Sequence, residues 1–196
     1  QAGDVAAAMA ALDLHYRAWA EEHVPDPDDR LSWLNVSRVM QQWFDTHTLD
    51  RFPVRIAPAM VEVGFALPLD GNFVFVGRMD GLGQEERGAF AVVDHKSSYR
   101  LDDKWRRTHR TSAQMTGYTW AAEHYVTEPV IGAYINGVEV SKLPNSDRKC
   151  RVHNVTYREC GSNHATFDLL ITTRPPHIKL EWHKTAIELA EQAKPA

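Results

Sequence analysis

The sequence is poor in cysteine, in long apolar runs and in net positive charge, and each shortage excludes a class of protein. Two cysteines in 196 residues cannot build a disulfide scaffold, and they fit a reducing compartment such as the cytoplasm. No apolar run reaches the roughly eighteen residues of a membrane-spanning helix, so none is expected. A net charge of −4 gives no overall attraction to nucleic acid, so binding would depend on a local basic patch.

The start of the chain also lacks the marks of a signal peptide. The apolar stretch 5–12 has no basic segment before it and no convincing cleavage site after it. Because the first residue is Gln1 rather than Met, we expect a piece of a longer protein or a processed product. The hydrophobic content of 43% allows one sizeable core, and no shift in composition marks a second domain. We therefore predict a single domain over residues 1–196.

Two apolar strands stand in the middle of the sequence, and each is predicted to end in charge. The first runs from Asn72 to Asp80 and the second from Gly88 to Lys96, with a polar, glycine-bearing connection between them. On the second strand a period of two places Val92, Asp94 and Lys96 on one face. Both faces are apolar before the charges begin, so this strand is predicted to lie in the middle of a sheet.

Two carboxylates and one lysine at neighbouring strand ends favour a divalent cation site. A buried, unpaired carboxylate is costly, and hard oxygen ligands suit Mg²⁺ or Mn²⁺. Such a cation would neutralise a phosphate oxygen and lower the pKa of a bound water, while Lys96 would hold or deprotonate that water. The pattern D-x-K alone carries little weight, since it occurs three times. An Asp-Lys ion pair at a sheet edge is the simpler alternative.

Three ordered motifs carry a family resemblance: GRMDG at 77–81, VVDHKS at 92–97 and QMTGY at 114–118. Together they resemble the PD-(D/E)xK nuclease superfamily, and specifically its RecB-like branch of bacterial and phage exonucleases with a Q-x3-Y motif. Met79 stands where the superfamily has its proline. The resemblance implies a restriction-endonuclease-like α/β fold, in which helices flank a central mixed sheet. The implied element order is αα-βββ-α-β, followed by a C-terminal hairpin and helix.

The resemblance implies a metal-dependent DNA nuclease, of the exonuclease type, that acts in DNA processing, repair or recombination in a bacterial or phage-infected cell. Asp80, Asp94 and the backbone carbonyl of His95 would hold Mg²⁺ or Mn²⁺, and Lys96 would act on the attacking water. Glu62, on a strand predicted just before, would help to line the site and support the metal shell. A carboxylate at an edge strand that faces water is the alternative for this glutamate.

The Q-x3-Y pair is predicted on a helix over residues 111–126. Gln114 and Tyr118 are four residues apart, so they lie on one face of that helix. The resemblance implies that this face contacts the substrate or orders the metal ligands. On spacing alone, Tyr118 would be a core residue and Gln114 a surface residue.

The segment between the lysine strand and that helix is predicted to be a flexible, basic loop. Its position beside the metal site would let arginines contact phosphates and an aromatic side chain contact a base. A solvated surface is the alternative. The predicted DNA contacts are Arg100, Lys104, Trp105, Arg106, Arg107 and Arg110.

The first helix is predicted over residues 4–22. RecB-like nucleases often carry G-x3-H there, but the matching register from Gly3 ends at Ala7, and His15 lies two helical turns further on. This departure supports a second hypothesis, a catalytically weakened module that binds DNA or a helicase partner. The set of Asp80, Asp94 and Lys96 favours the enzyme.

Cysteine and histidine also occur together late in the sequence. Two cysteines cannot complete the four-cysteine iron-sulfur cluster of some relatives, so none is expected. A zinc site is conceivable, but two of its ligands would point to opposite faces of a strand, and free cysteine is the simpler prediction. The four side chains concerned are Cys150, His153, Cys160 and His164.

Overall fold

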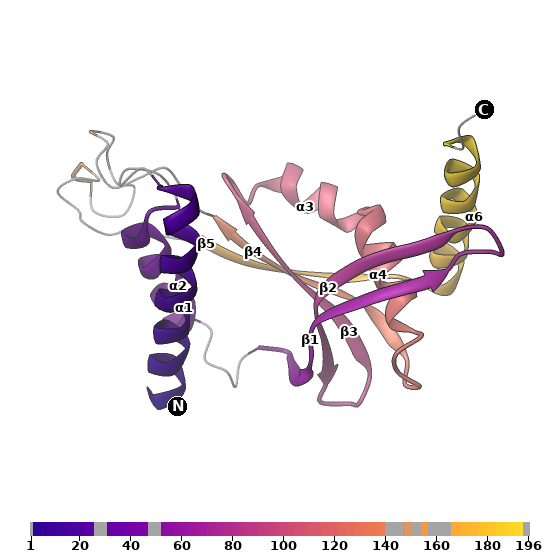
Figure 1. Cartoon of the computed structure of the whole chain (residues 1–196), viewed down its shortest axis with the longest axis horizontal. Coiled ribbons are helices and arrows are strands. Elements are labelled where there is room, and N and C mark those ends of the chain that lie inside the picture. Colours follow the sequence, from indigo (N-terminus) through magenta and orange to yellow (C-terminus); the bar gives the residue numbers. More distant parts are fainter. Residues whose placement is uncertain are drawn as a thin grey trace. The chain divides into compact units, whose positions relative to one another are not determined.

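The computed structural model of the chain describes residues 2–25, 31–46, 52–139, 147, 149, 154–156 and 166–193. The elements, in chain order, are α1 (Ala2–His23), α2 (Trp33–Thr46), β1 (Val54–Pro68), β2 (Val74–Glu85), β3 (Phe90–Ser98), α3 (Asp103–Arg110), α4 (Ala113–Ala122), β4 (Val130–Glu139), β5 (Thr166–Thr173) and α6 (Pro176–Gln192) (Figure 1).

The chain divides into two compact units. One unit consists of Gln1–Phe52, Ser97–Arg100 and Val138–Phe167, and the other of Pro53–Lys96, Leu101–Gly137 and Asp168–Ala196. The first unit contains α1 and α2, whose aromatic residues meet at Tyr16. Its ring centroid lies 5.2 Å from that of Trp33, and its hydroxyl donates to the carbonyl of Leu31 at 2.7 Å. That the chain forms one domain stays a prediction.

The five strands form one mixed sheet in the order β1-β2-β3-β4-β5. The pairs β1 with β2 and β2 with β3 are antiparallel. Two helices, α3 and α4, fill the long connection between β3 and β4, which is the kind of crossover that parallel strands need. The predicted α/β fold, a mixed sheet flanked by helices, is confirmed.

Strand β2 does not end at Asp80, as the sequence predicted, but continues to Glu85. The sequence predicted a loop at Gly81 and Gly83, which follow Asp80. Glycines in β2 instead let β1 pack closely against it. A Cβ atom on Gly83 would lie 2.6 Å from the Val54 side chain, and one on Gly77 would lie 2.5 Å from the ring of Phe65. Glycine therefore allows this strand pairing instead of interrupting it.

The predicted basic loop is also wrong, because residues 103–110 form helix α3. Asp102 caps the helix by accepting a hydrogen bond from the backbone amide of Trp105 at 2.9 Å. A second cap, in which Ser112 accepts from the amide of Met115, begins α4. The single helix predicted over residues 111–126 is thus the shorter helix α4, and helix α3 precedes it.

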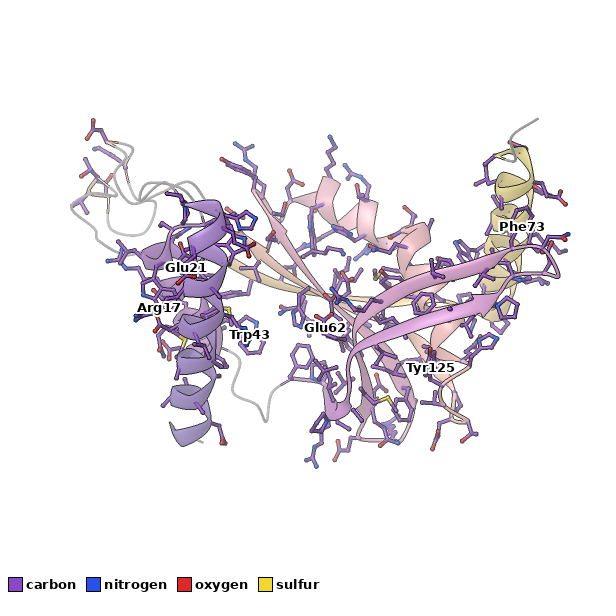
Figure 2. The ribbon with its side chains drawn as sticks, viewed as in Figure 1. Arg17, Glu21, Trp43, Glu62, Phe73 and Tyr125 are labelled. Carbon is purple, nitrogen blue, oxygen red and sulfur yellow. The ribbon has the colours of Figure 1, made fainter. Side chains whose placement is uncertain are left out.

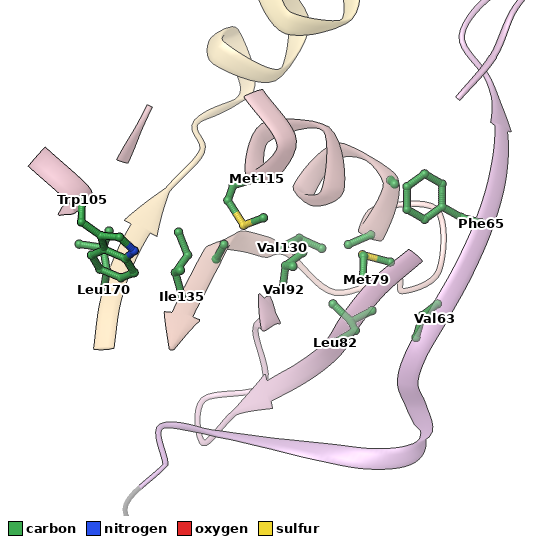
Figure 3. Packing of buried hydrophobic residues seen from close by; sticks show 13 residues of the cluster. Val63, Phe65, Met79, Leu82, Val92, Trp105, Met115, Val130, Ile135 and Leu170 are labelled. Carbon is green, nitrogen blue, oxygen red and sulfur yellow. The ribbon is translucent and has the colours of Figure 1, made fainter. Parts of the chain in front are cut away.

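The apolar core lies between the sheet and these helices (Figure 3). Leu82, Val92, Met115 and Ile135 are fully buried within it. Burial of such side chains supplies the main favourable free energy of folding. Helix α6 begins after Pro175 and packs against α4.

Strand β5 corresponds to the second strand of the predicted C-terminal hairpin. Of the first strand of that hairpin, residues 154–156 are described, and Thr156 pairs with Lys149 in an isolated antiparallel bridge. The residues Cys150, His153, Cys160 and His164 lie outside the described residues. Within the part of the chain that is described, no helix has the length and apolar character needed to cross a membrane.

Candidate active site

The two predicted acids meet on the central strands of the sheet. Gly81 lies opposite Val93 in the antiparallel pair of β2 and β3. The same register, extended by one residue, places Asp80 opposite Asp94, and directly opposed side chains project to the same side of a sheet. There the Asp80 side chain joins the strands, because its Oδ2 atom accepts a hydrogen bond from the backbone amide of His95 at 2.8 Å.

Asp94 is a buried carboxylate with a lysine beside it. Its side chain is 1% exposed, and Lys96 Nζ lies 3.1 Å from Oδ1 and 2.9 Å from Oδ2. Burial raises the pKa of Asp94 above its ordinary value, the lysine opposes this rise, and the negative charge of Asp80 adds to it. Lys96 is 30% exposed, so its ammonium lies between the buried acid and solvent.

The donor set fits a hard divalent cation. Both oxygens of the buried Asp94 carboxylate face the Lys96 ammonium, at 3.1 Å and 2.9 Å. Two carboxylates on adjoining strands, one of them buried, carry more negative charge than this one lysine offsets, and a cation would balance it. No group of three or more His, Cys, Asp or Glu side chains within metal-binding reach occurs among the described residues. Asp80 and Asp94 would therefore need backbone, water or substrate oxygens beside them, as Mg²⁺ sites commonly have.

The His95 side chain is held by a residue that the sequence did not point to. Its Nδ1 atom lies 2.9 Å from Nδ2 of Asn136, which is 1% exposed on β4. This contact ties the His95 ring to β4. A polar residue inside the apolar run of β4 was the available signal for Asn136.

Glu62 lies on β1 (Figure 2). The register that pairs Val61 with Gly81 and Val63 with Met79 places Glu62 opposite Asp80. Its φ of 53° is in the left-handed region, and the pairing of β1 is irregular just before it. The Glu62 carboxylate forms an ion pair with Arg78 Nε at 2.7 Å, in which both side chains are more than half exposed.

Gln114 and Tyr118 share one face of α4, as predicted. Gln114 Nε2 donates to the Tyr118 hydroxyl at 3.2 Å, and the Tyr118 ring packs edge-on against Phe65 with centroids 5.8 Å apart. Among the described residues, neither member of this pair forms a hydrogen bond or ring contact with Asp80 or Asp94. Their role toward the substrate therefore stays a prediction.

The predicted DNA-contacting residues separate into different environments. Trp105 is 8% exposed within the core, so its ring is not available to stack on a base, contrary to the prediction. Arg106 pairs with Asp168 at 2.7 Å, and Arg100 belongs to the first unit. The basic side chains that remain exposed on α3 are Lys104, Arg107 and Arg110.

Helix α3 also brings a histidine into the electrostatic field of the site. The ring of His109 lies 4.6 Å from that of Trp105, between centroids. Burial lowers the pKa of His109, the positive charge of Lys96 lowers it further, and Asp94 opposes both. Sequence reasoning missed this residue because it lay in a segment predicted to be a loop. Ala7 and His15 lie in α1, in the first unit, and their relation to a metal stays a prediction.

A mixed sheet flanked by helices, with two acids and a lysine on its central strands, defines an α/β protein of the restriction-endonuclease-like type. A model of the PD-(D/E)XK nuclease superfamily matches residues 2–194. The chain belongs to the PD-(D/E)XK nuclease superfamily. Comparison with curated proteins gives no match. Membership implies a nuclease, a hydrolase whose substrate is DNA, and use of divalent metal ions is general in the superfamily.

Proposed function

We propose that the chain is a Mg²⁺- or Mn²⁺-dependent deoxyribonuclease of the RecB-like branch, and that it acts as an exonuclease in DNA processing, repair or recombination. The observation that carries this proposal is that the strand register brings the buried Asp94 carboxylate, with Lys96 beside it, opposite Asp80. A structural ion pair would need Lys96 alone and gives no reason for a second acid at this point.

Asp80, Asp94 and the backbone carbonyl of His95 would hold the cation. When bound, the cation supplies charge neutralisation at a phosphate oxygen and acidifies water. The His95 amide fixes one oxygen of Asp80, which leaves the other oxygen of that carboxylate to act as a ligand. The contact with the Asn136 amide fixes the His95 ring and thereby restrains the backbone next to Asp94.

Lys96 has two candidate roles, and its surroundings favour one of them. Lys96 Nζ lies within hydrogen-bond distance of Asp94 and its side chain is 30% exposed, so it can donate hydrogen bonds to the attacking water and to the phosphate. We therefore assign Lys96 to orienting water and stabilising developing charge.

The substrate would extend from this site toward α3 and α4. Lys104, Arg107 and Arg110 are exposed and suit phosphate contacts, whereas Arg106 would first have to leave Asp168. Gln114 supplies an exposed amide next to the Tyr118 hydroxyl. These side chains position a polyanion and carry no base-specific information.

Cleavage of end-labelled single- and double-stranded DNA in Mg²⁺, Mn²⁺ or EDTA tests the proposal. The wild type should cut only with a cation, and Lys96→Ala should lower the rate by about 10²–10⁴-fold. Lys184→Ala, an exposed lysine on α6, is the matched control and should cut like wild type. Closed circular DNA of the same sequence should resist an exonuclease. Equal rates for wild type and Lys96→Ala would overturn the proposal.

If the wild type binds DNA without cation and never cuts, the alternative of a binding module is correct. That protein could still serve a helicase or recombination partner. The departure at Ala7 motivates this alternative, because Ala7 stands where the branch often places a histidine.

A further inference from the structure

Arg78 is a charged residue next to the candidate active site that the proposed function leaves without a role. It lies two residues before Asp80 on β2, so the two side chains project to the same side of the strand. The Arg78 side chain is 70% exposed. Its partner across the β1-β2 ladder is Gly64, at which even an added Cβ atom would meet nothing within 4 Å. The guanidinium therefore has open space beside the acids.

The contact that Arg78 makes is with the residue that the sequence assigned to the metal. Glu62 Oε2 lies 2.7 Å from Arg78 Nε. The backbone at Glu62 has a φ of 53°, a conformation that costs free energy for a residue other than glycine and that is concentrated at functional sites. At this backbone turn, which follows the irregular pairing of β1, the Glu62 carboxylate points to the Arg78 guanidinium.

The Glu62-Arg78 pair leaves the arginine able to bind a second anion. Only Nε of Arg78 is used in the described contact, so its terminal nitrogens can present the two parallel N–H groups that match a phosphate. An exposed ion pair of this kind contributes little stability, so a phosphate can replace the carboxylate at small cost.

Charge balance indicates the same ligand. Lys96 offsets Asp94 on one side of Asp80, and Arg78 offsets Glu62 on the other. The Asp80 carboxylate repels a nucleic-acid phosphate that approaches it. Lys96 and Arg78 are the cations that lie on the two sides of Asp80. An arginine two residues from Asp80 is thus placed for the phosphate next to the one that reacts.

We infer that Arg78 binds a backbone phosphate of the nucleic-acid substrate beside the candidate metal site, and that Glu62 pairs with this arginine until the phosphate replaces it and is not a metal ligand. The inference rests on the proposed function for its substrate. Arg78 is a binding residue, and Glu62 is an anion that competes with the phosphate for it. Both act through charge and neither takes part in bond breaking.

Binding of a fluorescent oligonucleotide in EDTA, over a range of salt concentration, tests the inference without any chemistry. Arg78→Gln should weaken binding about 5- to 10-fold near 50 mM salt and lower the slope of log K against log salt by about one. Arg78→Lys should keep most of the slope and lose part of the affinity, because it keeps the charge without the planar fork. Glu62→Gln should tighten binding by about 2- to 5-fold, since it removes the competing carboxylate.

Residues in the β2-β3 turn supply matched controls. Glu86 and Arg87 are exposed neighbours there, and Glu86→Gln and Arg87→Gln make the same changes in net charge. Both should bind within about twofold of wild type. Circular dichroism checks that each variant is folded. Equal binding by Arg78→Gln and Arg87→Gln would overturn the inference.

Calorimetric titration with Mn²⁺ in the absence of DNA decides the role of Glu62. Glu62→Gln should bind Mn²⁺ like wild type, and a tenfold weaker affinity would assign Glu62 to the metal instead. The two proposals fail separately. A wild type that cuts DNA while Arg78→Gln binds normally overturns only this inference. A wild type that binds through Arg78 but never cuts overturns only the nuclease.

Discussion

Two ion pairs lie on either side of Asp80, and they have the same chemistry in opposite surroundings. Asp94 and Lys96 form one on β3, where the carboxylate is 1% exposed. Glu62 and Arg78 form the other between β1 and β2, where the side chains are 55% and 70% exposed. Burial decides what each pair does. In the first pair burial raises the pKa of the acid in spite of the lysine, whereas the second pair remains exchangeable.

The buried pair is not explained by stability. Desolvation of two charges commonly cancels their attraction, and here burial raises the pKa of Asp94 in spite of the lysine. An apolar pair would be no less stable at this place. Burial of the Asp94 carboxylate costs free energy, which is consistent with a carboxylate that binds a cation.

The two ion pairs should differ most in their effect on the free energy of unfolding when the charges within each pair are exchanged. The double variant Asp94→Lys with Lys96→Asp puts a cation in the buried position and should lower the free energy of unfolding by about 3–5 kcal/mol. Glu62→Arg with Arg78→Glu should change it by less than about 1 kcal/mol, because both groups keep their water. Urea unfolding followed by circular dichroism measures both. Similar losses would show that exposure does not distinguish the pairs.

Asp80, between the pairs, should tolerate an amide structurally but not functionally. Asparagine keeps an oxygen that can accept from the His95 amide, so Asp80→Asn should keep the stability of wild type, whereas Asp80→Ala should lose about 1 kcal/mol. Both variants should bind Mn²⁺ at least about tenfold more weakly. Thermal unfolding and calorimetry test the two effects. Unchanged Mn²⁺ affinity in Asp80→Asn would remove Asp80 from the metal site.

Neutralising the buried acid should stabilise the protein in the absence of metal. Because the folded pKa of Asp94 is raised, the stability that this group contributes is present at acid pH and is lost as pH rises through that folded pKa. Asp94→Asn should therefore raise Tm by about 2–5 °C near neutral pH in EDTA. The advantage should shrink as pH falls. A less stable variant at neutral pH would show that the Lys96 pair outweighs burial.

The smallest expected effect is on His109. Since the positive charge of Lys96 lowers the pKa of His109, Lys96→Met should raise that pKa. Removal of the lysine also leaves the Asp94 charge unopposed, which shifts the pKa in the same direction. An NMR titration of the histidine side chains measures the change, with Lys184→Met as the control. No difference between the two variants would place His109 outside the field of the site.

Local pattern was sufficient to predict the helices at both ends of the chain. The C-terminal helix expected after the hairpin begins at Pro176, because proline suits the first turn of a helix. The alternation in Val92, Asp94 and Lys96 also predicted that the acid and the lysine would meet. These features depend on neighbours within a few residues.

Prediction failed where a distant partner decides the local structure. The glycines after Asp80 were taken for a connection, but β1 makes them part of a strand by packing Val54 and Ile56 against them. Trp105 was expected on a basic surface, and burial against the core turned that face of α3 inward. The contact of Glu62 with Arg78 was not predicted, because it depends on strand register and on a backbone turn that composition does not reveal.

The order of residues alone determined which groups carry charge and that an acid and a lysine share one strand face, because a strand alternates its side chains whatever surrounds it. The tertiary structure alone decided which of the two ion pairs is buried. It also placed Asp80 across from Asp94 and paired Arg78 with Glu62. Strand register and desolvation are properties of the assembled sheet, and no single segment contains them.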